Sequence, residues 1–204
     1  AACMGRDTEW VYRHLMHTSR PRTWLIAGYA GCGNLGDDAI ARRLIARMKA
    51  TDSATRISLT VASPSDPHHH FPGATLIDRR SPLSLIRAVR RSDALLLGGG
   101  CLLQNCSVHG NRSLAYYLSL TWLARLFKRP VWLVAAGIGP LRGRLARYMV
   151  GRTLRRAAYL SVRDGASRRL AISLGVPPAR IHREADPVLS LAPASKEAGK
   201  AFLE

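Results

Sequence analysis

Acidic residues are scarce in this 204-residue chain, which has 13 Asp and Glu against 31 Lys and Arg and a formal net charge of +18. Such an excess favours anionic partners: nucleic acid, an anionic membrane surface or phosphorylated substrates. Most arginines, however, recur at helical spacing, as Arg152, Arg155 and Arg156 do, and no basic block is interleaved with aromatic residues. A solvated, arginine-rich surface is at least as good an interpretation, and we expect no nucleic-acid partner.

Cysteine is also rare, and the four residues form neither a CxxC pair nor a zinc-ligand spacing. Cys32, Cys101 and Cys106 lie in glycine-rich loops, where small side chains beside a ligand are a better explanation than a metal site. The histidine triplet from His68 to His70 has no accompanying cluster of carboxylates or cysteines. We therefore predict no metal and no cofactor. We also expect the cysteines to be reduced thiols, as in the cytosol.

Long apolar segments are missing as well. The N-terminal residues lack the apolar core of a secretory signal. The most apolar later stretch, residues 116–139, is interrupted by basic residues and a proline, whereas a membrane span needs about 20 uninterrupted residues. The sequence predicts a cytoplasmic protein. Peripheral association with the inner face of the membrane stays open, because a basic surface attracts anionic lipid only where its charges cluster.

The segments that remain alternate between two patterns. Apolar or β-branched runs predict strands at 24–29, 56–62, 74–78, 93–98, 130–136 and 158–162, and at least one more within 180–191. Helical spacing occurs between them, as at 82–91, 114–127, 144–156 and 164–174, and in the second of these Leu118, Trp122 and Leu126 share a face. This order predicts an α/β fold, a Rossmann-like three-layer sandwich with a mostly parallel sheet. We assign residues 23–191 to this domain, 1–22 to a leader of undetermined structure, and 192–204 to the start of an inter-domain segment or second domain.

The first strand leads into a glycine loop and then a helix, within residues 23–46. Gly31, Gly33 and Gly36 fit the letters of G-x-G-x-x-G, which alone is a weak signal. Asp37 and Asp38 follow directly; they would repel a pyrophosphate, but a carboxylate there can cap the helix. A well-capped turn without a ligand is the alternative interpretation.

Four predicted strands end in unusual loops: GCGN at 31–34, GGGCLLQN at 98–105, GIGPLR at 137–142, and Arg163 with Asp164. In an open parallel sheet these carboxyl ends share one edge, so the loops would form a single crevice. Asn34, Gln104, Asn105, Arg142 and Arg163 would line it. Amides bind hydroxyls and guanidinium groups hold carboxylate or phosphate, so a polyhydroxylated or anionic ligand would suit it.

Each feature also has a purely structural interpretation. The glycines at 98–100 can permit close packing between strand and helix. Arg163 and Asp164 can form a structural salt bridge, and Asp164 is a better candidate for a helix N-cap than for a base.

These loops resemble the polysaccharide pyruvyl transferases of the bacterial cell-wall type. The matching runs are GYAGCGNLGDDAI at 28–40, LLLGGGCLLQN at 95–105, SLAYYL at 113–118, AAGIGPL at 135–141, LSVRDGASRRL at 160–170 and ADPVLSL at 185–191. The resemblance implies the first half of a GT-B-like enzyme with two Rossmann-like halves. It also implies transfer of the enolpyruvyl carbons of phosphoenolpyruvate, a co-substrate, to two hydroxyls of a cell-wall or surface sugar, with phosphate released.

The resemblance also implies roles for individual residues. The acceptor side would include Gly31, Asn34, Gly36, Asp37, Gly99, Gly100 and Gln104. Asp37 would be a base, Arg142 the first candidate for contact with phosphoenolpyruvate, and Arg163 the second. The acceptor could be lipid-linked.

The sequence departs from the family pattern at three points. Asn105 replaces an aspartate usual in the family and so loses any role as a base, and Asp38 replaces a glutamate. The second half, which supplies further donor contacts, is missing from the sequence, so we expect the 204 residues alone to lack full activity. Two alternatives stay open: half of a GT-B-type glycosyltransferase that uses a nucleotide sugar, and a basic nucleic-acid-binding module.

Overall fold

The computed structural model describes residues 22–66, 71–106 and 110–190. The histidine triplet, nearly all of the predicted leader at 1–22 and the segment 192–204 lie outside these residues.

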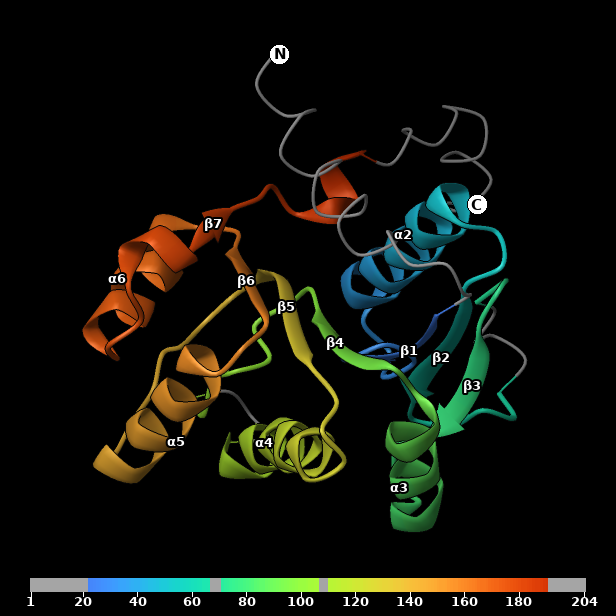
Figure 1. The fold of residues 1–204 in the computed structure, drawn as a ribbon, viewed down its shortest axis with the longest axis horizontal. Coiled ribbons are helices and arrows are strands. Elements are labelled where there is room, and N and C mark those ends of the chain that lie inside the picture. Colours follow the sequence, from blue (N-terminus) through green and yellow to red (C-terminus); the bar gives the residue numbers. More distant parts are fainter. Residues whose placement is uncertain (1–21, 67–70, 107–109, 191–204) are drawn as a thin grey trace, which may run out of the picture.

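A parallel sheet of seven strands forms the centre of the molecule (Figure 1). Its spatial order is β3-β2-β1-β4-β5-β6-β7, and every neighbouring pair is parallel. The strands are β1 (Thr23–Ala27), β2 (Arg56–Val61), β3 (Thr75–Asp78), β4 (Ala94–Gly98), β5 (Val131–Ala136), β6 (Tyr159–Val162) and β7 (His182–Arg183). The predicted Rossmann-like α/β fold is confirmed, and the ends of β1 to β6 lie within two residues of their predicted positions.

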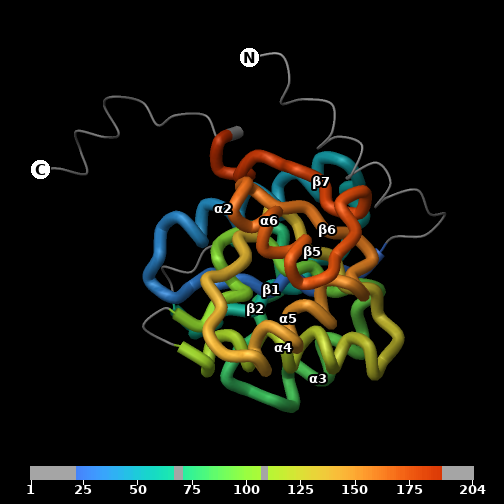
Figure 2. The backbone as a smooth tube through the Cα atoms, turned by 90° about the vertical axis from the view of Figure 1, so that its left-hand side faces the viewer, coloured from blue at the N-terminus to red at the C-terminus, as the bar shows by residue number. Residues whose placement is uncertain are grey.

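Helices cover both faces of the sheet. They are α2 (Leu35–Thr51), α3 (Pro82–Arg91), α4 (Gly110–Leu126), α5 (Arg144–Arg155) and α6 (Gly165–Ser173), with short 3₁₀ turns η1 (Pro178–Arg180) and η2 (Pro187–Ser190). In Figures 1 and 2, β1 and β2 lie between α2 on one side and the layer of α3 and α4 on the other. The helix α5 extends that second layer, because α4 packs against both α3 and α5.

The two faces follow from the alternation of side chains along each strand. In β1, Trp24 and Ile26 pack into the core beneath α2, whereas Leu25 and Ala27 join the core shared with α3, α4 and α5. All five residues of β4 are buried, as expected for a central parallel strand covered on both faces.

Side-chain caps fix where the helices begin. Asp164 caps α6 by accepting a hydrogen bond from Ser167 N–H at 2.7 Å, which confirms its predicted role. At α2 the cap is Asn34, which accepts from Gly36 N–H at 3.0 Å. The predicted capping by Asp37 or Asp38 is therefore wrong. The helix begins at Leu35, so both carboxylates lie inside its first turn and not at the N-cap position.

The helix α4 exposes large apolar side chains to solvent. Leu118, Trp122 and Leu126 share a face, but Trp122 is 64% exposed and Leu126 is 60% exposed. The face that packs on the sheet instead includes Tyr117 and Leu120. A helix that is apolar on several sides does not reveal its core face from sequence periodicity alone.

A buried carboxylate closes the β6 and β7 edge of the sheet. Glu184 is 6% exposed and accepts hydrogen bonds from Tyr159 Oη at 2.6 Å and Ser161 Oγ at 2.8 Å. Ser161 Oγ in turn accepts from Ala135 N–H at 2.8 Å. This network links β5, β6 and the chain after β7, and so positions the segment that leads to Asp186 and η2.

Candidate functional site

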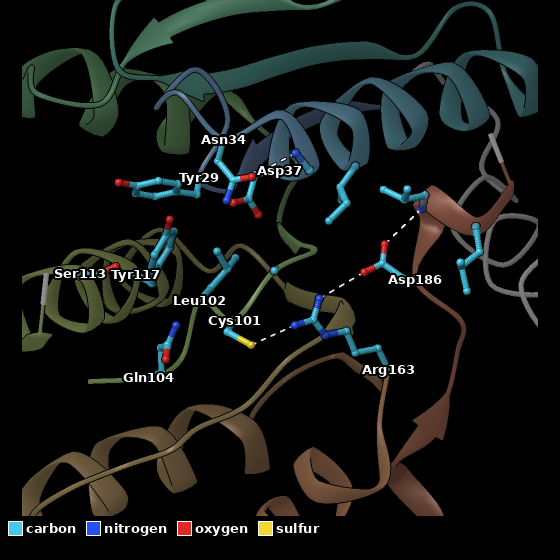
Figure 3. Close-up of a pocket in the computed structure, with 15 residues that line it drawn as sticks. Tyr29, Asn34, Asp37, Cys101, Leu102, Gln104, Ser113, Tyr117, Arg163 and Asp186 are labelled. Carbon is cyan, nitrogen blue, oxygen red and sulfur yellow. Dashed lines mark hydrogen bonds and ion pairs between the residues drawn. The ribbon is translucent and has the colours of Figure 1, made fainter. Parts of the chain in front are cut away.

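A pocket of about 660 Å³ opens at the carboxyl ends of β1, β4 and β6 (Figure 3). The strand order reverses between β1 and β4, and such a switch point is where open α/β sheets bind ligands. Its volume suits a small-molecule site. The pocket is lined by Tyr29, Asn34, Gly36, Asp37, Ile40, Gly100, Cys101, Leu102, Gln104, Ser113, Tyr117, Arg163, Asp186, Val188 and Leu189.

Most of the site residues predicted from the sequence meet in this pocket. Asn34, Gly36, Asp37, Gly100, Gln104 and Arg163 line it, whereas Gly31, Gly99, Asn105 and Arg142 are not among its lining residues. The predicted convergence of separate loops on one edge is therefore observed for three strand ends. The chemical role of each residue stays a prediction.

Arg142, the first candidate for a donor contact, lies apart from the pocket lining. Its side chain is exposed, and its backbone is held by Asn105. Asn105 Oδ1 accepts from Arg142 N–H at 2.8 Å, and Asn105 Nδ2 donates to the Arg142 carbonyl at 2.9 Å. The amide thus connects the loops after β4 and β5. The sequence placed both residues on the correct edge, but it could not show that they bind each other.

The glycines at the end of β4 and directly after it let α2 approach the sheet closely. A Cβ on Gly98 would overlap Leu44, one on Gly99 would overlap Ile40, and one on Gly100 would lie 2.6 Å from Asp37 Oδ1. The packing interpretation of this glycine run is therefore supported. It also serves the site, because Gly100 leaves the space in which the Asp37 carboxylate lies.

We expect Gly99→Ala to lower the free energy of unfolding by about 2–4 kcal/mol, since it adds left-handed backbone strain to a clash with Ile40. Gly33→Ala is the matched control, because Gly33 also has positive φ but no atom lies within 4 Å of its added Cβ. It should cost only about 1–2 kcal/mol. Urea unfolding measures both. Equal losses in the two variants would contradict the steric contribution.

Asp38 shapes the first loop, and Asp37 faces the pocket. Asp38 Oδ1 accepts from Gly31 N–H at 2.7 Å, which closes the glycine turn onto the start of α2. Gly31, with φ of 65°, is buried, and its N–H is used inside the protein instead of pointing at a ligand. Asp37 projects between Asn34 and the opposite wall of the pocket (Figure 3).

The environment of Asp37 raises the pKa of its carboxyl group. Burial raises the pKa of the Asp37 carboxyl above its ordinary value of 3.8, and the neighbouring charge of Asp38 raises it further. Arg163 acts in the opposite direction, and Asp186 adds to the rise. A carboxyl group with a raised pKa inside a pocket is suited to give a proton to a substrate as well as to accept one.

The opposite wall of the pocket presents a charged cluster. Arg163 Nη1 donates to Asp186 Oδ2 at 3.1 Å, and Arg163 Nη2 contacts Cys101 Sγ at 3.0 Å (Figure 3). Asp164 is 3.8 Å from Arg163 Nε, so the predicted Arg163–Asp164 pair is the weaker of its two salt bridges. Asp186 also accepts from Val188 N–H at 3.1 Å, which fixes the start of η2.

The other end of the pocket is aromatic. Tyr29, Tyr117, Ser113 and Gln104 line this end, with Tyr117 between Tyr29 and Gln104 in the view of Figure 3. Next to them, the Arg79 guanidinium lies 4.4 Å from the centroid of the Tyr116 ring and 5.5 Å from that of Tyr29, and Arg79 Nη1 contacts Cys32 Sγ at 3.0 Å. Arg79 thus packs against the rings of Tyr29 and Tyr116 by cation–π contacts and helps to hold the aromatic end in place.

Sequence reasoning did not assign Tyr29, Tyr117, Cys101, Asp186 or Arg79 to the site. Tyr29 and Tyr117 fall within apolar runs, where an aromatic side chain is more often a core residue. Their only signal was their position inside the GYAGCGN and SLAYYL runs. Arg79 directly follows β3, and Asp186 lies beyond β7. Only the folded sheet brings Asp186 to the pocket lining and Arg79 against the Tyr29 ring.

Residues 22–66, 71–106 and 110–190 contain no cluster of three or more metal-ligating side chains. Among the same residues, no helix is both long and apolar enough to cross a membrane.

Comparison with known proteins gives a family match. The model of a family described as polysaccharide pyruvyl transferase matches residues 34–201, which is most of the chain. No curated protein sequence matches the chain.

Solved structures share the fold. One is Anabaena Alr3699/HepE in complex with UDP and glucose, at 12% identity and a TM-score of 0.50 over 81% of this chain and 44% of that one. Another is the UDP-GlcNAc 2-epimerase from Neisseria meningitidis bound to UDP-GlcNAc, at 11% identity and a TM-score of 0.51 over 81% of this chain and 47% of that one. Both are GT-B-like folds. This chain therefore spans less than half the length of either, and at such low identity the likeness concerns the fold alone.

Proposed function

The chain belongs to the polysaccharide pyruvyl transferase family, and on this basis we propose that it transfers the pyruvyl group of phosphoenolpyruvate to a sugar of a cell-wall or surface polysaccharide. One observation supports the proposal most strongly: the pocket at the β1 and β4 switch point has Asp37, whose pKa is raised, on one wall and the Arg163 cluster on the other.

The acceptor sugar is assigned to the aromatic end. Tyr29 and Tyr117 offer ring surfaces for the apolar face of a sugar. Asn34, Gln104 and Ser113 supply amide and hydroxyl groups for its hydroxyls. This end lies next to Asp37, so a sugar bound there would bring a hydroxyl close to the carboxyl group.

The small acid is assigned to the Arg163 end. Its guanidinium has five N–H donors, and the contacts with Asp186 and Cys101 leave others for a carboxylate or phosphate. Asp186 opposes an anion there. Protonation of Asp37, which its raised pKa favours, would remove a second carboxylate charge that would repel the donor. Arg142, on the exposed loop after β5, stays a candidate for contact at the rim.

The reaction needs one acid and one base. A proton is added to the methylene carbon of phosphoenolpyruvate, and a sugar hydroxyl attacks the adjacent carbon as it loses its own proton. The bond from that carbon to the phosphate oxygen breaks, phosphate leaves, and a second hydroxyl attacks to close the ketal and releases a proton. Asp37 is the residue that we propose gives the first proton, and its carboxylate then accepts one from a hydroxyl.

The length comparison supports a two-half enzyme. The chain spans 44% and 47% of the two similar structures. We propose that residues 23–191 form the acceptor-binding half and that the segment from 192 leads toward a second half with further cationic groups for the donor. We also propose that the acceptor is lipid-linked and that the protein works at the inner face of the membrane. The proposed reaction requires no cofactor.

A thermal-shift series tests the donor assignment. We expect phosphoenolpyruvate to raise the melting temperature by about 5–10 °C at a hundredfold excess over its Kd. A uridine nucleotide sugar should leave it unchanged; protection by the nucleotide sugar alone would favour a glycosyltransferase and overturn the proposal. Release of phosphate from phosphoenolpyruvate that requires an N-acetylmannosamine-type acceptor would identify the reaction.

A further inference from the structure

Exposed apolar side chains gather on one layer of the molecule. Nine large hydrophobic residues are exposed within the described ranges, and seven of them lie on α3, α4 and α5. Leu83 and Ile86 lie on α3, Trp122 and Leu126 on α4, and the other three within residues 145–149 of α5. The remaining two, Leu35 and Leu189, are next to or within the pocket lining.

The same layer is almost free of negative charge. Residues 82–158 contain thirteen Arg and Lys residues and a single acidic one, Asp93, which lies just before β4 and accepts a hydrogen bond from Thr23 N–H at 2.9 Å. None of the three helices contains an acidic residue. The helices themselves carry nine arginines, so positive charge and exposed apolar side chains occur in the same layer.

The three helices form one surface. They lie side by side on one face of the sheet, and α4 packs against both neighbours (Figure 1). On α5, Leu145 and Tyr148 are 73% and 57% exposed, and they alternate with the exposed Arg144, Arg147 and Arg152. Exposed arginines and large apolar residues thus occur together along α5, and Arg147 Nη2 also contacts Ser173 Oγ of α6 at 3.4 Å.

We propose that this surface, the outward side of α3, α4 and α5, docks the protein on an anionic lipid bilayer. The arginines would pair with lipid phosphates, and Trp122, Leu145 and Tyr148 would enter the interfacial region. Basic residues gain attraction to an anionic leaflet when they cluster within a Debye length of it. The proposal gives a structural basis to the membrane location proposed above, but its test does not depend on pyruvyl transfer.

Two other partners fit the surface less well. A nucleic-acid backbone would use the arginines, but it has no favourable contact for exposed Leu145, Met149 and Leu126. A second copy of the chain would bring two arginine-rich faces together, and like charges would oppose the contact. A bilayer matches both the charge and the apolar side chains.

Docking would leave the pocket accessible. The pocket lies at the carboxyl edge of the sheet. The first half of α4 contributes Ser113 and Tyr117 to it, whereas Trp122 and Leu126 lie in the second half. A docked molecule would hold the pocket close to the bilayer without covering it.

Vesicle co-sedimentation tests the proposal. The protein should bind vesicles of mixed phosphatidylglycerol and phosphatidylcholine, and should not bind phosphatidylcholine alone. Binding should weaken as salt rises from about 50 to 200 mM, because screening shortens the reach of the charges. Tryptophan fluorescence should shift to the blue on binding, and Trp122→Phe should remove most of that shift.

A charge-reversal pair provides the decisive variant. R147E/R152E should lower the partition coefficient by about 30-fold or more. R42E/R183E has the same net charge and reverses exposed residues on α2 and β7, so it should bind within about threefold of the parent. A thermal melt confirms that each variant is folded. Equal loss in both pairs, no binding to anionic vesicles, an unchanged fluorescence spectrum, or preferential binding of duplex DNA through Arg147 and Arg152 would each overturn the proposal.

Discussion

Replacing Asp37 with asparagine is expected to lower turnover by about 10²–10⁴-fold, the range that a lost acid-base group produces. Asparagine keeps the shape of the side chain beside Gly100 but cannot exchange a proton. Phosphate release in the presence of acceptor measures the change. Turnover within a few-fold of the parent would contradict the role of Asp37.

The same substitution should change stability in a pH-dependent way. Because burial raises the pKa of Asp37 in the folded state, the folded protein binds this proton more tightly than the unfolded chain. The contribution of Asp37 to the free energy of unfolding therefore falls as pH rises from the ordinary value of 3.8 through the raised value. We expect Asp37→Asn to be more stable than the parent at neutral pH, and this gain to disappear below the ordinary value.

Asp38→Asn is the matched control for both measurements. It keeps an oxygen that can accept from Gly31 N–H, and it leaves the Asp37 carboxyl in place. The charge of Asp38 helps to raise the pKa of Asp37, so its removal should lower that pKa. Turnover should persist, and the alkaline limb of the pH profile, where Asp37 loses its proton, should move to lower pH. If the pH profile does not move, the alkaline limb does not report the ionisation of Asp37.

Replacing Arg163 with glutamine is expected to weaken phosphoenolpyruvate binding by about 30-fold or more, which corresponds to roughly 2 kcal/mol. Glutamine removes the positive charge opposite Asp37 and leaves Asp186 to repel the donor. Arg163→Lys should recover only part of the affinity, since an ammonium group lacks the planar fork of donors. Calorimetric titration measures all three proteins.

Asp186→Asn separates anion binding from a structural role for Arg163. It breaks the 3.1 Å ion pair but keeps the guanidinium, and it removes a negative charge from the pocket. If Arg163 binds the donor, Asp186→Asn should hold or raise its affinity. If the pair only stabilises the fold, Asp186→Asn and Arg163→Gln should lose affinity and stability together.

The fold was predictable because its signals are local. The central strands are continuous apolar runs, the helices have their own periodicity, and the order of the two defines a parallel sheet covered on both faces. The site edge was predictable for the same reason: glycine-rich loops after parallel strands must meet along one edge. Asn34, Gln104 and Arg163 were assigned to that edge, and they line one pocket.

Other features depended on contacts that a sequence does not show. Asn105 and Arg142 were both assigned to substrate, and the structure shows them bound to each other. Trp122 and Leu126 were placed together on a face, but whether that face packs inward depends on how α4 rotates against the sheet.

The sequence by itself determined the class of fold, the edge that holds the loops and the family, because each follows from the order of residues along the chain. Only the tertiary structure decided which side chains face the pocket and that the positive charges of three separate helices form one surface. Burial, desolvation and the distance between charges depend on three-dimensional packing, and these quantities raise the pKa of Asp37 and place Arg163 between Cys101 and Asp186.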